Sequence, residues 1–156
     1  MRQNLHASAM VVGDRGVLVT GPSGSGKTTL CMALLDFGAH SGVPVRMLGD
    51  DQLFLESHAG RLVATAPESI AGLMEVRGFR PSRMAAELSA VVDLLIRLVP
   101  PQEAPRFNDG GSETLAGVTI PVLHLPQRKT PQAVLAIRAR LDFPPFLPLR
   151  VEKSTK

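Results

Sequence analysis

The sequence predicts an α/β domain in which a sheet lies beside helices. Segments with strand-like and helix-like patterns are interleaved along the chain, which is typical of this fold class. A chain of 156 residues is long enough for one domain with a sizeable core. Hydrophobic residues make up 44% of the chain and charged residues 20%, which indicates a folded globular protein rather than a disordered one.

The N-terminal half is expected to contain several short strands and one helix. An apolar, β-branched run that ends at Gly21 indicates a buried strand, and the apolar spacing after it becomes helical. Gly38 is a plausible helix stop, since glycine often follows the last turn. The elements expected here are a strand at 17–20, a helix at 28–37, a strand at 45–48 and hairpin strands at 53–55 and 61–65.

The C-terminal half continues the alternation and ends in a proline-rich segment. A proline at the start favours a short helix, and alternation of apolar with polar residues favours a strand. The elements expected here are helices at 67–74 and 84–88, a strand at 92–98, a loop at 102–114, a strand at 118–125 interrupted by Pro121, and a helix from Thr130 to Leu141. The boundaries predicted are a domain over 1–141 and a tail over 142–156.

Charge and composition argue against several classes of partner. The net charge is +3, from 17 basic and 14 acidic residues, and the basic residues are scattered. Trp and Tyr are missing from the sequence, so we expect no nucleic-acid partner. No apolar run is long enough to span a membrane, and Cys31 is the one cysteine. These features predict a cytoplasmic protein without a membrane partner, in which Cys31 is a small core residue.

A phosphate-binding loop follows the first predicted strand. The segment matches G-x-x-x-x-G-K-[ST] in full, with a strand before it and a helix after it. Lys27 is expected to reach the β- and γ-phosphates of ATP, and the Thr28 hydroxyl to ligate Mg²⁺. The predicted nucleotide-binding residues are Gly21, Pro22, Ser23, Gly24, Ser25, Gly26, Lys27, Thr28 and Thr29.

Three further polar features are candidates for the same chemistry. Asp50 and Asp51 end a predicted strand, at the edge where ligands of parallel sheets bind, and two adjacent carboxylates can divide metal binding and proton transfer between them. They can equally be turn aspartates. Glu75 and Arg77 can be a solvated surface pair, and a lone histidine such as His6 is more often structural than catalytic.

These features together resemble the catalytic C-terminal domain of bacterial HPr kinase/phosphorylase. The resemblance covers roughly residues 4–140 and depends on the order of four motifs. They are His6-Ala7-Ser8, the phosphate-binding loop with the strand before it, Asp50-Asp51, and Leu73-Met74-Glu75-Val76-Arg77-Gly78. The resemblance implies a single P-loop nucleotide-binding domain with a central mixed sheet and flanking helices, in a short form without the family's N-terminal domain.

The family's roles carry over by position. The resemblance implies a proton acceptor at Asp51, which becomes the proton donor in the reverse reaction. It also implies an active-site histidine at His6, a catalytic lysine at Lys27, metal ligands at Thr28, Asp50 and Glu75, and an active-site arginine at Arg106.

The resemblance further implies an ATP- and Mg²⁺-dependent serine protein kinase that acts on an HPr-like phosphocarrier protein in phosphotransferase-system regulation. A homo-oligomer is left open. Two alternatives remain. One is a small-molecule kinase, for which residues 100–115 would supply a lid. The other is a non-catalytic nucleotide-dependent sensor, against which the intact Lys27, Thr28 and Asp51 argue.

Several segments depart from the family pattern. About six extra residues separate the loop helix from Asp50, and the C-terminal helical part is short. Residues 79–83, Phe-Arg-Pro-Ser-Arg, replace an apolar stretch of the family. The late segment tied to dephosphorylation reads Pro-Gln-Arg-Lys-Thr-Pro at 126–131, without its expected Gly-Arg ending. We therefore expect a kinase with weak or absent phosphorylase activity.

Overall fold

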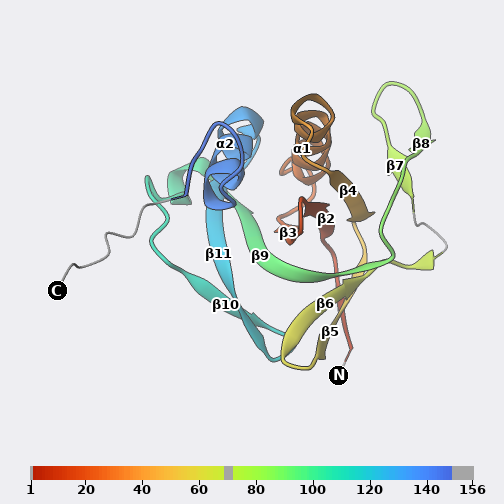
Figure 1. Ribbon diagram of the computed structural model, residues 1–156, viewed down its shortest axis with the longest axis horizontal. Coiled ribbons are helices and arrows are strands. Elements are labelled where there is room, and N and C mark those ends of the chain that lie inside the picture. Colours follow the sequence, from red (N-terminus) through yellow and green to blue (C-terminus); the bar gives the residue numbers. More distant parts are fainter. Residues whose placement is uncertain (1, 69–71, 149–156) are drawn as a thin grey trace.

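A nine-stranded mixed sheet forms the frame of the computed structural model, which describes residues 2–68 and 72–148 (Figure 1). Its main path has the order β1-β5-β6-β9-β3-β2-β4, and β11 joins at β9 with β10 beside it. The strands are β1 (Gln3–Leu5), β2 (Ser8–Val12), β3 (Arg15–Thr20), β4 (Val45–Gly49), β5 (Leu53–His58), β6 (Arg61–Thr65), β9 (Ser89–Val99), β10 (Ser112–Leu115) and β11 (Val118–Pro126). The predicted α/β class with a mixed sheet is thus confirmed.

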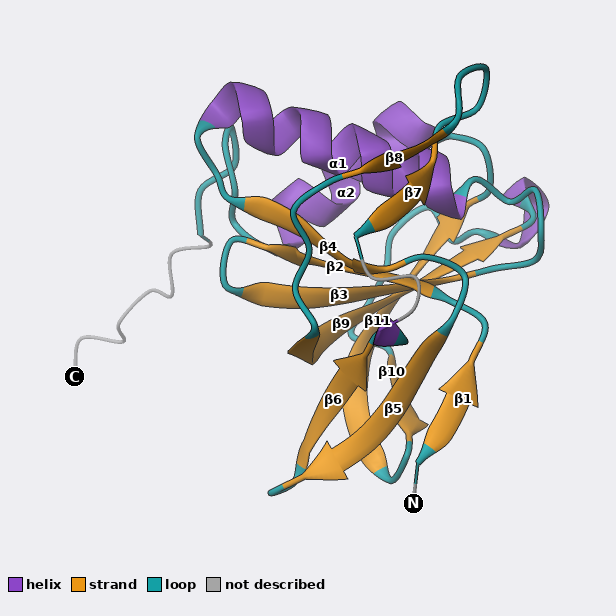
Figure 2. Ribbon diagram, turned by 90° about the vertical axis from the view of Figure 1, so that its right-hand side faces the viewer, coloured by secondary structure: helices purple, strands orange, loops and turns teal. Residues whose placement is uncertain are grey.

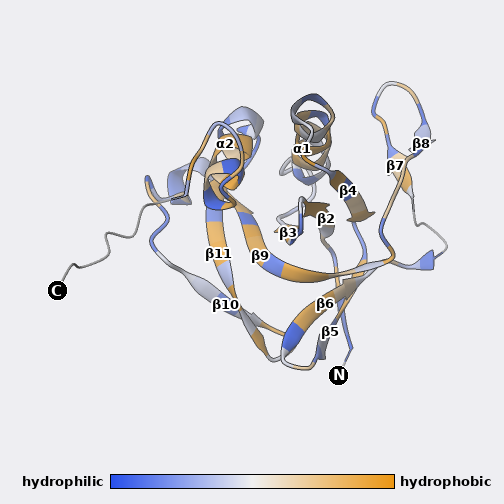
Figure 3. Ribbon diagram, in the orientation of Figure 1, coloured by the Kyte–Doolittle hydropathy of each residue, from blue (hydrophilic) through white to orange (hydrophobic). Residues whose placement is uncertain are grey.

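The long strand β9 joins the two parts of the sheet. Its first residues pair antiparallel with β6, and its later residues run parallel to β3 on one side and to β11 on the other. The sheet therefore curls around β9 (Figure 2). Leu94, Ile96 and Leu98 enter a core beneath the helices, and Leu95 enters a second core on the opposite face. Figure 3 shows the apolar residues along β9 and β11.

Two helices, α1 (Lys27–Ser41) and α2 (Thr130–Arg140), cover one face of the sheet (Figure 1). The stop expected at Gly38 is wrong. The helix continues to Ser41 and ends at Gly42, whose φ of 79° is left-handed and whose N–H donates to the Gly38 carbonyl oxygen. Gly38 instead permits close packing, because a Cβ there would lie 2.5 Å from Cγ2 of Val45.

The predicted strands at 17–20, 45–48, 53–55, 61–65, 92–98 and 118–125 are confirmed, as is the helix from Thr130. Pro121 does not interrupt β11, because the strand continues with Val122 donating its N–H to the Gly111 carbonyl oxygen. The loop expected at 102–114 is partly wrong, since it contains β10 and follows a short 3₁₀ turn, η2 (Pro101–Glu103). Antiparallel pairing with β11 orders β10.

Of the two short helices expected before β9, the one at 84–88 is wrong, and the one at 67–74 is wrong at its C-terminal end, although Glu68 is in a 3₁₀ helix. Leu73–Glu75 forms β7, which pairs with β8 (Pro81–Arg83) as a separate hairpin, while residues 69–71 lie outside the described residues. Residues 84–88 are not helical, because Glu87 donates its N–H to the Met47 carbonyl oxygen at the edge of β4. Tertiary hydrogen bonding thus overrides local helix propensity.

The chain after α2 contains no regular element in residues 142–148, and 149–156 lie outside the described residues. The division into 1–141 and 142–156 stays a prediction. Among the described helices, none has the length and apolar character needed to cross a membrane.

An ion pair ties β10 to the centre of the sheet. Two nitrogens of Arg97 donate to the two carboxylate oxygens of Glu113, each at 2.5 Å. A third nitrogen lies 3.4 Å from Oγ1 of Thr20, the last residue of β3. The hydrogen bond from Arg97 lowers the pKa of the Glu113 carboxyl, against an opposing effect of burial. Because the pKa is lowered on folding, the pair stabilises the fold above the unfolded-state pKa and loses its effect as pH falls through the folded-state value.

Glu113→Gln should therefore lower the free energy of unfolding near pH 7 by about 1 kcal/mol, as expected for a partly exposed, charge-assisted pair. The difference from wild type should shrink in acid, below about pH 4. Urea unfolding at several pH values measures the free energy of unfolding of each protein and how the difference between them changes with pH. Glu103→Gln is the matched control, since Glu103 forms no ion pair in the described chain. A loss that stays constant down to pH 3 would contradict this assignment.

Candidate active site

The phosphate-binding loop lies between β3 and α1, as the sequence predicts. It turns tightly, with the Ser25 N–H donating to the Pro22 carbonyl oxygen at 3.1 Å. Gly26 adopts a φ of 99°, which other residues rarely reach, and directly precedes the helix. The first amides of α1 are thus free at the end of the helix, where an anion is favoured by both the N–H groups and the helix dipole.

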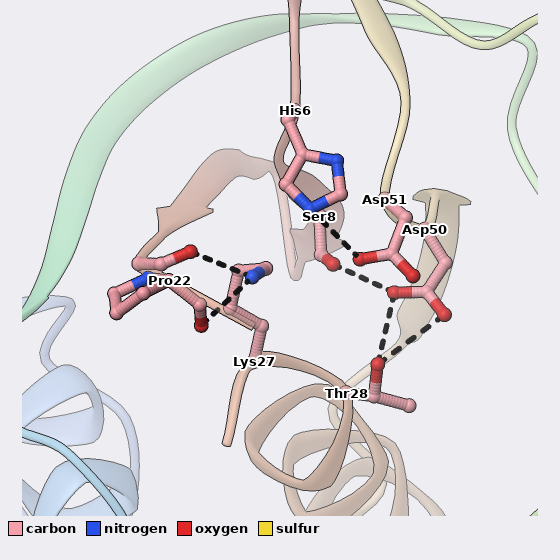
Figure 4. A network of polar contacts seen from close by, with 8 residues as sticks. His6, Ser8, Pro22, Lys27, Thr28, Asp50 and Asp51 are labelled. Atoms are coloured by element: carbon pink, nitrogen blue, oxygen red, sulfur yellow. Dashed lines mark hydrogen bonds and ion pairs between the residues drawn. The ribbon is translucent and has the colours of Figure 1, made fainter. Parts of the chain in front are cut away.

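Lys27 is folded into this loop rather than extended into solvent. The residue is only 5% exposed, and its Nζ donates to the carbonyl oxygens of Gly21 at 2.7 Å and Pro22 at 3.4 Å (Figure 4). Ser25 is also buried, and its hydroxyl has no hydrogen-bond partner within the described chain. A buried cation and an unpaired donor beside free amides fit the phosphates of a nucleotide.

Asp50 is held by two hydroxyl donors from other elements. Ser8 of β2 donates to Oδ1 at 2.6 Å, and Thr28 of α1 lies 3.1 Å from Oδ1 and 3.3 Å from Oδ2 (Figure 4). Adjacent corners of an octahedron with Mg–O bonds of 2.0–2.1 Å are about 3.0 Å apart. The oxygens of Thr28 and Asp50 are therefore already spaced as neighbouring ligands of Mg²⁺.

Asp51 is turned away from these donors. Its φ of 65° is unusual for a residue other than glycine, although aspartate tolerates this conformation better than most. Its Oδ1 lies 3.8 Å from Nε2 of His6, and both side chains are about 60% exposed (Figure 4). That distance suits an ion pair when the imidazole is protonated, but it is too long for a hydrogen bond. The two aspartates are thus in different environments.

Two clefts meet at this pair of aspartates. One, of about 500 Å³, is lined by the phosphate-binding loop together with Glu75, Val76, Arg77 and Arg128. The other, of about 590 Å³, is lined by Asn4, Leu5, His6 and Gln52. Asp50 and Asp51 line both. A group bound at the loop and a group bound on the far side would therefore face each other across the same two carboxylates.

Two residues at the site are absent from the sequence-based assignments. Ser8 contacts Asp50, and the only sequence signal for it was its place in the His6-Ala7-Ser8 motif. Arg128 lines the loop cleft, and its N–H donates to the Ser25 carbonyl oxygen at 3.1 Å from a backbone with a φ of 57°. Its signal was the positive charge of the late segment at 126–131.

The structure does not bring Arg106 to the other predicted residues. Arg106 lies in an exposed loop with its guanidinium 5.4 Å from the ring centre of Phe107, and it lines neither cleft. Glu75 lines the loop cleft, but residues 2–68 and 72–148 contain no group of three or more His, Cys, Asp or Glu side chains placed to hold a metal. A Mg²⁺ ion at this place would therefore need Thr28 and the phosphates of a nucleotide among its ligands, and Mg²⁺ commonly has few carboxylate ligands.

Cys31 is a core residue, as expected. It lies fully buried in α1 behind the loop. Burial raises the pKa of its thiol, and the negative charges of Asp50 and Asp51 raise it further. The thiol is therefore protonated and unreactive at neutral pH, which excludes it from nucleophilic chemistry.

Comparisons with known proteins identify the same segments. The family model for the HPr serine kinase C-terminal domain matches residues 1–80. The HPr kinase/phosphorylases of Limosilactobacillus reuteri (strain DSM 20016) and Xanthomonas campestris pv. campestris (strain B100) are each 29% identical to the chain, over 137 and 140 residues. Both alignments cover 80% of this chain but only 41% and 42% of those proteins, so the chain spans less than half of their length.

The solved structure of the Hpr(Ser) kinase/phosphatase from Coxiella burnetii has the same arrangement. It superposes with a TM-score of 0.75 and 25% sequence identity, covering 90% of this chain and 88% of the other. The family model alone accounts for more than half of the chain, including the loop, the aspartate pair and Glu75. The chain belongs to the HPr serine kinase C-terminal domain family.

Proposed function

We propose that this protein transfers the γ-phosphoryl group of ATP to a serine hydroxyl of an HPr-like phosphocarrier protein. The observation that carries this proposal is that the cleft at the phosphate-binding loop and a second cleft share Asp50 and Asp51. The names of the relatives, HPr kinase/phosphorylase, support the phosphocarrier as the acceptor. Such an acceptor also implies a cytoplasmic protein.

The residues of the loop cleft supply the charge and positioning that phosphoryl transfer requires. ATP bound with Mg²⁺ supplies the phosphoryl group and an electrophilic phosphorus, and Thr28, Asp50 and Glu75 would hold the metal. Lys27 exchanges its bonds to the loop carbonyl oxygens for the phosphates. Arg77 and Arg128, which line the same cleft, add positive charge toward the transferred group.

Asp51 acts on the acceptor side. Its carboxylate is not engaged by Ser8 or Thr28, which both bond Asp50, so it is free to accept the proton of the serine hydroxyl. The serine oxygen then forms a bond to phosphorus, and the bond to the bridging oxygen of ADP breaks. His6, 3.8 Å away, orients Asp51 and, when protonated, stabilises its charge.

The geometry does not favour the small-molecule alternative. None of residues 100–115, the expected lid, lines either cleft, and η2 and β10 lie against β11. A sensor without catalysis would not need Lys27, Thr28 and Asp51 together around one site. A kinase with a protein acceptor therefore remains the function that the site supports best.

The experiment that tests the function is incubation with labelled ATP, Mg²⁺ and purified HPr, followed by mapping of the phosphorylated residue.

Lys27→Ala should remove transfer and weaken ATP binding, because the buried cation of the loop is lost. Lys129→Ala is the matched control, since this exposed lysine lines neither cleft. Transfer by wild type to nucleosides or sugars but not to HPr would favour the small-molecule kinase. Undiminished transfer by Lys27→Ala would contradict the assignment of this loop as the phosphate-binding site.

The two aspartates should respond differently to removal of charge. Asp51→Asn should lower kcat for transfer by about 10²–10⁴-fold, the usual contribution of a general base, and change ATP affinity only a few fold. Asp50→Asn should mainly weaken the dependence on Mg²⁺, because Asp50 is the aspartate bonded to Thr28. Steady-state kinetics and MgATP titration measure these effects. If Asp50→Asn abolished transfer and Asp51→Asn spared it, the roles would be reversed.

The reverse reaction should be at least about tenfold slower than transfer to HPr. In that reaction an oxygen of inorganic phosphate attacks the phosphoserine phosphorus, the bond to the serine oxygen breaks with a proton from Asp51, and pyrophosphate leaves. Two anions must share the site, which demands well-placed cations. Of the late segment at 126–131, Thr130 and Pro131 belong to α2, and only Arg128 lines the cleft at the phosphate-binding loop. The segment therefore contributes a single cation to that cleft. Pyrophosphate release from phosphoserine-HPr measures the rate, and equal rates would restore the bifunctional activity.

A further inference from the structure

The β7–β8 hairpin projects from the helix side of the sheet (Figures 1 and 2). It forms its own two-stranded sheet, with Leu73 opposite Arg83 and Glu75 opposite Pro81. Met74 fixes its base, since that residue is 2% exposed and belongs to the core beneath the helices. Met84 packs against the same core and donates its N–H to the Gly72 carbonyl oxygen. The base of the hairpin is thus anchored in the core, while its turn at 76–80 extends away from the core. We call the hairpin of residues 73–83 the arm.

The free end combines an exposed aromatic ring with unpaired arginines. The turn is closed by the Phe79 N–H, which donates to the Val76 carbonyl oxygen at 3.0 Å. Phe79 is 71% exposed and is covered only by the guanidinium of Arg80, 5.0 Å from the ring centre. Arg77 and Arg80 at this end are both exposed, and neither forms an ion pair in the part of the chain that the structure describes.

Folding does not explain this composition. An exposed phenylalanine contributes little burial, and two guanidinium groups in one short turn, Arg77 and Arg80, repel each other. Aromatic residues and arginine are, in contrast, the side chains enriched at the centres of protein interfaces. This end of the arm includes Phe79 and Arg80, which begin the segment 79–83 that the sequence predicts to depart from the family pattern.

The arm is continuous with the catalytic cleft. Glu75, Val76 and Arg77, at the end of β7, line the cleft that also contains Lys27 and Asp51. A protein that contacts Phe79 and Arg80 would therefore lie at the mouth of that cleft. A small metabolite bound between the loop and the aspartates would not need the far end of the arm.

The geometry points to the end of the β7–β8 hairpin as a docking surface for the acceptor protein, through an acidic patch with an apolar residue at its centre. Phe79 packs on the apolar residue, and Arg80 pairs with a carboxylate beside it. The inference rests on the proposed function. It adds which surface of this protein recognises the acceptor and which side chains the acceptor presents to it. Opposite charges at the rim would speed the encounter and make it sensitive to salt.

The test uses Phe79→Ala and Arg80→Glu, neither of which lines a cleft. The matched controls are Phe107→Ala, an equally exposed phenylalanine under an arginine, and Arg140→Glu on the exposed surface of α2. The measurements are KM and kcat for transfer to purified HPr, the Kd of MgATP, and the mass in solution by sedimentation. Wild type and Arg80→Glu are also compared between about 0.05 and 0.5 M NaCl.

Each arm variant should raise KM for HPr about tenfold, as expected when a central interface side chain is removed. The kcat and the Kd of MgATP should stay within about twofold, and the controls should match wild type. KM of wild type should rise with salt, and that of Arg80→Glu should rise less. If circular dichroism showed that Phe79→Ala does not fold, Arg80→Glu alone would decide.

Unchanged KM in folded arm variants would overturn the docking surface while leaving the proposed function intact. A fall in mass in both arm variants would also overturn it, because the arm would then be a contact between copies of this chain. If wild-type protein transferred nothing to HPr, the proposed function would fail first, and acceptor docking would fail with it.

Discussion

The carboxylate of Asp50 is the contact on which the site depends. It accepts hydrogen bonds from Ser8 on β2 and Thr28 on α1, and it directly follows the last residue of β4, so one side chain joins three elements. The three residues are separated by 20 and 22 positions in the sequence and meet only because β2 pairs with both β3 and β4. The order of strands in the sheet therefore brings these three residues together.

This arrangement separates two chemically identical side chains. Asp50 accepts hydrogen bonds from two hydroxyl groups, while the left-handed backbone at Asp51 turns its carboxylate toward His6 and the second cleft. A residue held in an uncommon backbone conformation at such a place is typical of functional sites, where surrounding structure compensates the strain. The proposed mechanism uses this difference, with one carboxylate on the metal and its neighbour in sequence as the proton acceptor.

Local patterns in the sequence were enough for the parts of the fold that depend on local chemistry. The loop between β3 and α1 could be predicted because its glycines, lysine and threonine act within one turn, and the predicted strands came from apolar runs, turn residues and, at 92–98, alternation. Gly38 was misread because its role is a close approach to Val45, which is distant in sequence and invisible to helix-end rules. Residues 84–88 were misread because a hydrogen bond to β4, not their own propensity, sets their path.

The dependence on contacts distant in sequence also explains why Arg106 was assigned to the site and Arg128 was not. Arg106 was assigned by its order along the chain, yet its loop leads to an exposed surface beside Phe107. Arg128 is drawn to the cleft instead, because its own N–H bonds the Ser25 carbonyl oxygen and Gln127 bonds the end of β9. A backbone fixed to the phosphate-binding loop thus holds a cation at the cleft, where the proposed reaction would place the transferred group. Such preorganised charge stabilises a transition state more effectively than an arginine that must first be ordered.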